Sequence, residues 1–132
     1  MNPDSHVLIV EDDAGISALL KTILETEGYE VTSARNGQEA LQFLDAGVIP
    51  CLILLDLEMP VMNGWELKGK LAADPRFRDI PVAVMSASED RLESFHGSLR
   101  RLKKPFNVKD LIGAVGEHCA PAGAGTADCR DS

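Results

Sequence analysis

Two short apolar segments, each followed at once by acidic residues, limit what this chain can fold into. Residues 7–10 (VLIV) are followed by the acidic residues 11–13 (EDD), and residues 52–55 (LILL) are followed by Asp56. Apolar runs of this length are typical of strands that are buried on both faces of a parallel sheet. In open α/β proteins the residues after such strands meet at the carboxyl edge of the sheet, where ligands bind. The sequence therefore predicts an acidic cluster at one edge of an α/β sheet.

A cluster of carboxylates needs a positive partner. Like charges about 4 Å apart repel each other by roughly 4 kcal/mol at an effective dielectric constant near 20. A divalent cation is the obvious neutralising group, and Mg²⁺ is usually held by one or two carboxylates together with phosphate oxygens. The acidic cluster therefore indicates a Mg²⁺ site.

Strand and helix patterns alternate along the rest of the chain. Strands are expected at residues 7–10, 29–34, 52–55, 82–85 and 99–102. The helices expected between them carry apolar residues at helical spacing: Ile16, Leu19, Leu20, Ile23 and Leu24 in the first, Ala40, Leu41 and Leu44 in the second, Trp65, Leu67 and Leu71 in the third, and Val108, Leu111, Ile112 and Val115 in the last. A short helix is expected at residues 89–96, which makes five helices in total.

The alternation predicts one doubly wound α/β domain with a five-stranded, mostly parallel sheet and helices on both faces. A chain of 132 residues with 45% hydrophobic residues fits a single core. Residues 1–5 are expected to be an N-terminal extension and residues 6–118 the folded domain. Residues 119–132 are expected to be a disordered tail or the start of a linker, because Pro, Gly, Ala and polar residues dominate there.

Charge and cysteine content narrow the possible functions. The net charge of −8 argues against direct binding of nucleic acid, which requires phosphate neutralisation. No segment is long and apolar enough to span a bilayer, so no membrane contact is expected. Cys51, Cys119 and Cys129 are odd in number and lack metal-site spacing, so neither a disulfide framework nor a zinc site is predicted, and the expected location is the reducing cytoplasm.

Further polar residues follow the fourth and fifth expected strands, namely Ser86 and Lys104. A phosphoryl group that arrived at Asp56 would find the cation on one side and the Lys104 ammonium on the other. Stabilising charge on the transferring oxygens is the main requirement of phosphoryl transfer. The Ser86 hydroxyl could donate a hydrogen bond to the same oxygens.

Each of these residues also has a plainer interpretation. Asp12 or Asp13 could cap the first helix, and Asp56 or Ser86 could be a turn residue. Lys104 taken alone could be a solvated surface lysine. The plainer interpretations are less convincing when the residues are considered together, because chance would have to place chemically compatible groups at four strand ends of one sheet.

Four segments in order carry a family resemblance: VLIVEDD at 7–13, LLDLEMPVMNG at 54–64, VMSA at 84–87 and KPF at 104–106. Together they resemble the receiver domain of bacterial two-component response regulators, over roughly residues 6–118. The resemblance implies a flavodoxin-like fold with strand order 2-1-3-4-5. It also implies that the chain is no enzyme beyond catalysing its own phosphorylation and dephosphorylation.

The resemblance assigns a role to each site residue. Asp56 would be the phosphoacceptor, modified by a sensor histidine kinase or a histidine phosphotransfer protein. Glu11, Asp12 and Asp56 would hold the Mg²⁺ cofactor together with the backbone carbonyl of Glu58. Ser86 would be the switch hydroxyl, and Lys104 would pair with the phosphoryl group. A cis peptide bond before Pro105 is expected on the same basis.

The sequence departs from the family pattern near the fifth expected strand. Arg101 stands where the family commonly has an aromatic residue, and the spacing of 18 residues between Ser86 and Lys104 is short. We hypothesise that Arg100 and Arg101 contact an acidic output protein, although charged residues also protect a solvated strand edge from aggregation. The side chain of Glu58 is expected to influence the lifetime of the phosphoryl group.

Three other functions fit parts of the sequence. A small-molecule enzyme of the same fold is disfavoured, because no glycine-rich phosphate loop follows the first strand. A phosphatase with an aspartyl nucleophile would have a second acid two residues later, where Glu58 stands, but the following MPVMNG segment fits the receiver better. The main alternative is a degenerate receiver that binds proteins without being phosphorylated.

Overall fold

The computed structural model of the protein describes residues 5–57, 64–88, 92 and 100–121. Its strands are β1 (His6–Val10), β2 (Glu30–Ala34), β3 (Leu52–Asp56), β4 (Val82–Ser86) and β5 (Arg100–Lys103). Its helices are α1 (Ala14–Thr26), α2 (Gly37–Asp45), α3 (Gly64–Ala73) and α5 (Val108–Gly116). Each strand lies within one residue of its expected limits. The helix expected at residues 89–96 falls outside the described residues, apart from Leu92.

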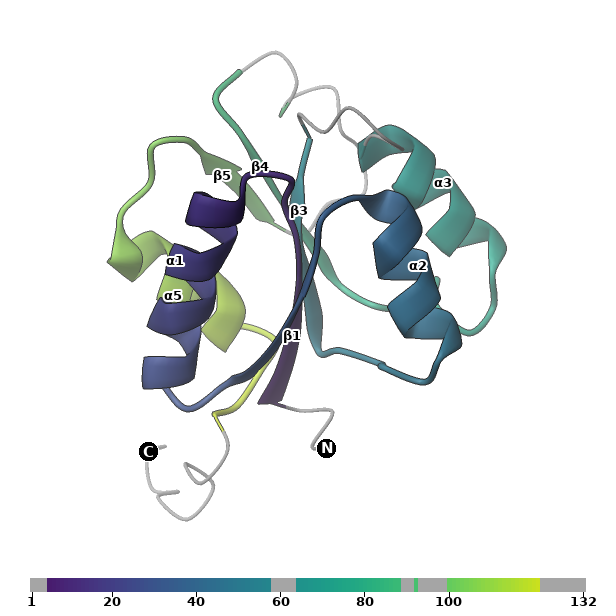
Figure 1. Cartoon of the computed structure of the whole chain (residues 1–132), viewed down its shortest axis with the longest axis horizontal. Coiled ribbons are helices and arrows are strands. Elements are labelled where there is room, and N and C mark those ends of the chain that lie inside the picture. The colour runs from purple at the N-terminus through teal and green to yellow at the C-terminus, as the bar shows by residue number, and fades with distance from the viewer. Residues whose placement is uncertain (1–4, 58–63, 89–91, 93–99, 122–132) are drawn as a thin grey trace.

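The five strands form one parallel sheet in the order β2-β1-β3-β4-β5. The chain moves outward from β1 to β2, crosses back to β3, and continues to β5, so the winding direction reverses between β1 and β3. Helices α1 and α5 lie on one side of the sheet, and α2 and α3 lie on the other (Figure 1). The predicted doubly wound, flavodoxin-like fold is confirmed.

The alternation of side chains along the buried strands produces two separate cores. Leu8, Ile53 and Val84 point to the core beneath α2 and α3, whereas their neighbours Leu54 and Met85 point to the core beneath α1 and α5. Because both faces of β1, β3 and β4 are covered, the interior positions of these strands are apolar. Their polar residues lie at the strand ends: His6 begins β1, and Asp56 and Ser86 end β3 and β4.

Side-chain caps begin three of the described helices where the sequence predicts. Asn36 Oδ1 accepts from the backbone N–H of Glu39 at 2.8 Å, and Asn107 Oδ1 accepts from that of Asp110 at 2.8 Å. Asp13 caps α1 in the same way. These caps satisfy backbone donors that have no partner within the helix.

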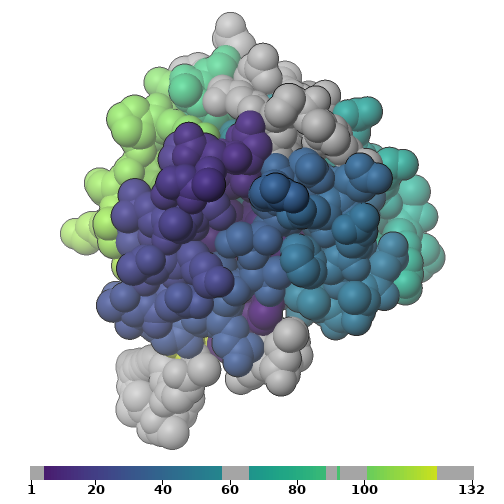
Figure 2. Space-filling view, in the orientation of Figure 1, coloured from purple at the N-terminus to yellow at the C-terminus, as the bar shows by residue number. Residues whose placement is uncertain are grey.

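The predicted apolar face of α1 is only partly used in the core. Leu20 and Leu24 are buried, but Ile16 is 36% exposed and Leu19 is 59% exposed. Leu20 and Leu24 pack in the core against the sheet, whereas Ile16 and Leu19 lie beside residues 104–106. In the space-filling view, α1 lies left of the centre of the visible face and α2 lies right of it, with later parts of the chain at both rims (Figure 2).

The expectation of no disulfide is wrong. Cys51, just before β3, and Cys119, just after α5, form a disulfide with a Cα–Cα distance of 5.5 Å. The two residues are 68 positions apart in sequence, so only the packing of α5 on the sheet brings them together. In the described part of the chain, no helix combines the length and apolarity needed to cross a membrane.

Candidate functional site

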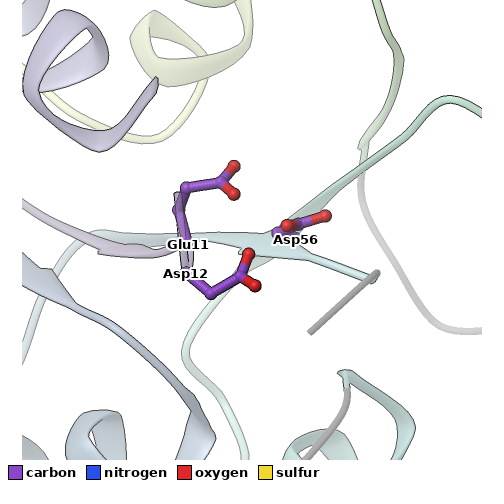
Figure 3. A group of neighbouring side chains, drawn as sticks. All are labelled: Glu11, Asp12 and Asp56. Atoms are coloured by element: carbon purple, nitrogen blue, oxygen red, sulfur yellow. The ribbon is translucent and has the colours of Figure 1, made fainter. Parts of the chain in front are cut away.

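Three carboxylates from two neighbouring strands meet at the carboxyl edge of the sheet. Glu11 and Asp12 follow β1, and Asp56 is the last residue of β3. One oxygen of each lies within 4.8 Å of the others, and the three side chains converge (Figure 3). Glu11 and Asp56 are each only 2% exposed, whereas Asp12 is exposed. The predicted acidic cluster is present, with one face open to solvent.

The structure separates the roles of the two adjacent aspartates. Asp13 Oδ1 accepts a hydrogen bond from the Ile16 N–H at 3.0 Å, so Asp13 is the helix cap. Asp12 instead points toward Asp56 (Figure 3). The backbone N–H of Asp13 lies 3.3 Å from Glu11 Oε2 and donates to it. The residue that caps α1 therefore also helps to orient Glu11.

Lys104 provides the positive charge of the site. Its Nζ lies 3.3 Å from Asp56 Oδ1 and 3.4 Å from Glu11 Oε1. The backbone N–H of Lys104 donates to the Ser86 carbonyl at 2.8 Å, which fixes the start of the side chain beside β4. A peptide bond in the cis form follows, between Lys104 and Pro105, as the resemblance implied.

Burial and mutual repulsion change the protonation of this cluster. Burial raises the pKa of Glu11 to about 7, with further contributions from the hydrogen bond and the negative charge of Asp56. Burial by itself lowers the pKa of Lys104, but attraction to Asp56 and Glu11 outweighs it and the pKa rises. Without a cation, the site therefore holds a lysine that stays charged and a glutamate that takes up a proton near neutral pH.

Ser86 is the last residue of β4 and is fully buried. In the sheet register Asp56 is opposite Met85, so Ser86 lies one position further along the neighbouring strand. Its Oγ accepts a hydrogen bond from the Ser88 N–H at 3.0 Å. Ser86 thus stands at the same sheet edge as Asp56. Glu58, whose carbonyl is the remaining predicted ligand, lies outside the described residues.

The donor set of this cluster fits a hard divalent cation. All the candidate ligand atoms are carboxylate oxygens, which Mg²⁺ prefers, and no described His or Cys belongs to the cluster. The exposed side of Asp12 leaves room for water or phosphate oxygens. The chemistry of the cluster therefore agrees with the predicted Mg²⁺ site.

An apolar groove of about 440 Å³ begins at Lys104 and runs between α1 and the segment that joins β5 to α5. It is lined by Ile16, Leu19, Leu20, Ala87, Lys104, Pro105 and Phe106. Periodicity assigned the α1 residues to the core, so the groove was not predicted. The sequence signal that could have revealed it is the width of the apolar face of α1, which exceeds what one sheet contact needs.

The basic stretch occupies the edge strand β5. The side chain of Arg101 is exposed, and that of Arg100 lies outside the described part of the structure. Leu102 is buried in the core beneath α1 and α5. The alternation of the strand thus places Arg101 on the face of the sheet opposite to Leu102.

Comparison with known proteins agrees with this fold. The family model for the response regulator receiver domain matches residues 7–116. The DNA-binding dual master transcriptional regulator RpaA of Synechocystis is 36% identical over 114 residues, which cover 83% of this chain and 47% of RpaA. The chain spans about half the length of the first curated relatives that it matches.

Two solved structures show the same architecture. The chemotaxis protein CheY4 of Vibrio cholerae has a TM-score of 0.79 at 27% identity, covering 86% of this chain and 98% of CheY4. The response regulator protein TrrA of Thermotoga maritima, solved in complex with Mg²⁺-BeF, has a TM-score of 0.76 at 30% identity. That match covers 86% of this chain and 97% of TrrA.

Proposed function

Since this chain belongs to the response regulator receiver family, we propose that it accepts a phosphoryl group on Asp56 from a phosphohistidine protein and thereby changes its partner contacts. The observation that carries the proposal is the Asp56 carboxylate, which is 2% exposed and lies 3.3 Å from Lys104 Nζ and beside Glu11 and Asp12. In this proposal the Asp56 carboxylate is the nucleophile. Lys104 supplies positive charge, and Glu11 and Asp12 supply ligand oxygens for a cation.

In the proposed reaction an oxygen of Asp56 attacks phosphorus. The P–N bond to the donor imidazole breaks, a P–O bond to Asp56 forms, and the imidazole leaves with the bonding electron pair. Lys104 stabilises negative charge on the transferring oxygens, since its Nζ already lies beside Asp56. Glu11, Asp12 and the Glu58 carbonyl would hold Mg²⁺ with Asp56, and the bound ion would supply further positive charge at the phosphoryl oxygens.

The change of partner contacts would start at Ser86 and Lys104. Phosphorylation adds about −1.5 to −2 charges at Asp56. Lys104 would then exchange its contacts with two carboxylates for contacts with phosphoryl oxygens, and the Ser86 hydroxyl would donate to the same oxygens. Ser86 ends β4, and Lys104 directly follows β5. Phosphorylation would therefore favour the conformation in which these two residues lie closer to the phosphoryl oxygens, and the population of that conformation would rise.

The first prediction concerns Asp56. Incubation of the intact protein with acetyl phosphate and Mg²⁺ is expected to add one phosphoryl group, and Asp56→Asn is expected to abolish the addition. Intact-protein mass spectrometry measures it. Asp45→Asn, which removes an exposed acid at the end of α2, is the matched control and should be modified like the wild type.

Other outcomes of that incubation identify the alternatives. Absence of modification in wild type would contradict the proposal and favour a degenerate receiver that binds partners without phosphorylation. Continuous turnover of small phosphate esters that do not modify Asp56 would indicate an enzyme instead.

We propose that the phosphohistidine protein docks in the groove beside Lys104. A donor must approach Asp56 from the open edge of the sheet, and the groove leads from that edge past Lys104 to Phe106. Leu19, which is 59% exposed on its rim, offers an apolar contact close to the reacting group. The expected occupant is therefore a donor with an apolar surface next to its histidine.

The second prediction follows from this groove. Leu19→Glu is expected to slow transfer from the donor protein about tenfold or more, equivalent to about 1.4 kcal/mol, and to leave modification by acetyl phosphate unchanged. Phosphotransfer time courses with both donors measure the difference. The control Ile49→Glu adds the same charge to an exposed apolar residue that precedes β3, away from the groove. Equal slowing by both substitutions would contradict the assignment.

We further propose that Arg100 and Arg101 contact an acidic output protein. Arg101 is exposed on edge strand β5, three residues before the site residue Lys104. Arg101→Ala is expected to lower the affinity for the output protein and to reduce the salt dependence of that affinity. Arg78→Ala removes another exposed arginine and is expected to change neither quantity. Unchanged affinity and salt dependence would rule the contact out.

We place this reaction in the cytoplasm and assign no direct nucleic-acid contact to these residues. The net charge of −8 opposes binding to phosphate backbones. RpaA is named as DNA-binding and is about twice as long as its match to this chain. The present residues would therefore act through protein contacts.

A further inference from the structure

The Cys51–Cys119 disulfide lies at the edge of the sheet opposite to the phosphoacceptor. Cys51 immediately precedes β3, and Asp56 ends that strand. Five residues of extended chain separate their Cα atoms by about 16 Å. The disulfide therefore does not belong to the acidic site.

We propose that Cys51 and Cys119 form a reversible redox modification site that fastens the last turn of α5 to the base of the sheet. The Cα–Cα distance of 5.5 Å falls in the range that a disulfide spans without backbone movement. Disulfides in a reducing compartment are usually transient and redox-sensing. This site is separate from phosphoryl transfer and needs no residue of the Asp56 cluster.

The structure accommodates the reduced form as well as the oxidised one. Cys51 Sγ lies 3.2 Å from the carbonyl oxygen of His6, to which a Cys51 thiol can donate. Cys119 is 8% exposed and belongs to the core beneath α1 and α5, where a free thiol packs as a small apolar group. Reduction therefore leaves no buried donor without an acceptor at Cys51, and the fold is retained.

Oxidation can proceed by two thiol–disulfide exchanges with a low-molecular-weight disulfide such as oxidised glutathione. The Cys51 thiolate is the more accessible, and it attacks one glutathione sulfur, forms a mixed disulfide and releases one glutathione thiolate. The Cys119 thiolate then attacks the Cys51 sulfur and releases the second glutathione thiolate. The two cysteines lose two protons and two electrons, and oxidised glutathione gains them as two glutathione molecules.

The modification would act on the end of α5. The backbone N–H groups of His118 and Cys119 both donate to the Val115 carbonyl, at 3.1 and 2.9 Å, and close the final turn. In the reduced protein no covalent link holds this turn, and its hydrogen bonds can open readily because helix ends open more easily than the core. In the oxidised protein the covalent link to Cys51 holds the same turn. The oxidation state would thus determine how firmly residues 116–119 are held.

The test compares the wild-type protein in oxidised glutathione with the same protein in dithiothreitol. Peptide mapping is expected to find the Cys51–Cys119 link only in the oxidised sample. Amide exchange at His118 and Cys119 is expected to slow about tenfold or more on oxidation, and the melting temperature to rise by roughly 10 °C. Cys51→Ser and Cys119→Ser should lose these responses, and Cys129→Ser should keep them.

Several results would overturn the proposal. These are a disulfide that includes Cys129, absence of any disulfide in oxidised glutathione, or a link that forms but leaves amide exchange unchanged. Modification of Asp56 by acetyl phosphate is expected to be equal within about twofold in both redox states, because about 16 Å separate the sites. Loss of that modification in both states would contradict the phosphoacceptor function alone.

Discussion

At the residue scale, the site is a set of charges that compensate one another incompletely. Two buried carboxylates, Glu11 and Asp56, share one lysine, and the pKa of Glu11 rises to about 7 because of its burial and the negative charge of Asp56. The exposed Asp12 adds a third negative group. A cluster of this kind is destabilising for the empty protein and suited to a cation.

The raised pKa of Glu11 predicts a pH dependence of stability in the metal-free protein. The native state holds the Glu11 proton more tightly than the unfolded chain, so the associated stability is fully present below pH 4.5 and is lost as pH rises through about 7. Between pH 5 and 8 this loss is expected to reach about 2–3 kcal/mol. Urea unfolding in the presence of a chelator measures it.

Glu11→Gln is expected to remove most of this slope, since glutamine cannot ionise. Glu27→Gln, which replaces an exposed glutamate after α1, should keep it. A wild-type stability that rises over the same pH interval would contradict the assignment to Glu11.

At the element scale, the carboxyl ends of β1, β3, β4 and β5 supply the functional groups, and nearby backbone groups orient two of them. The N-cap residue of α1, Asp13, donates its backbone N–H to Glu11, and the Ser86 carbonyl accepts the N–H of Lys104. Helix α5 begins at the Asn107 cap, three residues after Lys104. The short segment 105–107 thus joins the site residue Lys104 to α5.

The cap of α5 gives a prediction at this scale. Asn107→Ala is expected to lower the free energy of unfolding by about 1 kcal/mol, because the Asp110 N–H loses its acceptor. Asn107→Asp and Asn107→Ser retain an acceptor and should remain close to the wild type. Denaturant unfolding measures all three variants. An alanine variant as stable as the serine variant would show that the cap contributes nothing.

At the scale of the whole molecule, the reversal of winding between β1 and β3 brings the acidic residues of two separate sequence segments together. Helices on both faces bury the strands, so the functional groups lie only at the exposed edge. A cation bound between β1 and β3 would join two halves of the fold. Cation binding should therefore be visible in global stability.

The last prediction uses this link. At tenfold above its dissociation constant, Mg²⁺ is expected to raise the free energy of unfolding by about 1.4 kcal/mol, and a chelator should reverse the effect. Asp12→Asn is expected to shift the Mg²⁺ midpoint about tenfold upward while leaving stability in chelator nearly unchanged, since Asp12 is exposed. Thermal unfolding over a Mg²⁺ titration measures both.

Asp13→Asn is the matched control for this titration. It removes the same charge from the next residue, keeps a capping side chain, and contributes no oxygen to the cluster. If Asp12→Asn and Asp13→Asn shift the Mg²⁺ midpoint equally, the shift comes from the loss of a negative charge near the site, and Asp12 is not a direct ligand of Mg²⁺.

Much of the fold and the site was predictable because the relevant signals are local. Strands that are buried on both faces of a parallel sheet have an apolar interior, so residues 7–10 and 52–55 could be recognised as strands. The acidic residues that follow them could then be recognised as candidates for the site. The caps Asn36 and Asn107 were predictable for the same reason, since a cap acts within three residues. Segment order then limits the topology to very few arrangements.

The sequence by itself determined the strands, their order along the chain and which polar groups end them, since these follow from local burial and turn chemistry. Tertiary structure alone decided that Asp13 caps α1 while Asp12 joins Asp56, that Leu19 stays exposed beside a groove, and that Cys51 meets Cys119. The placement of Asp12 beside Asp56, the groove beside Leu19 and the disulfide depend on how segments distant in sequence pack in space, whereas the Asp13 cap is a local contact for which the sequence left Asp12 as the alternative. Local sequence patterns do not predict which distant segments come into contact.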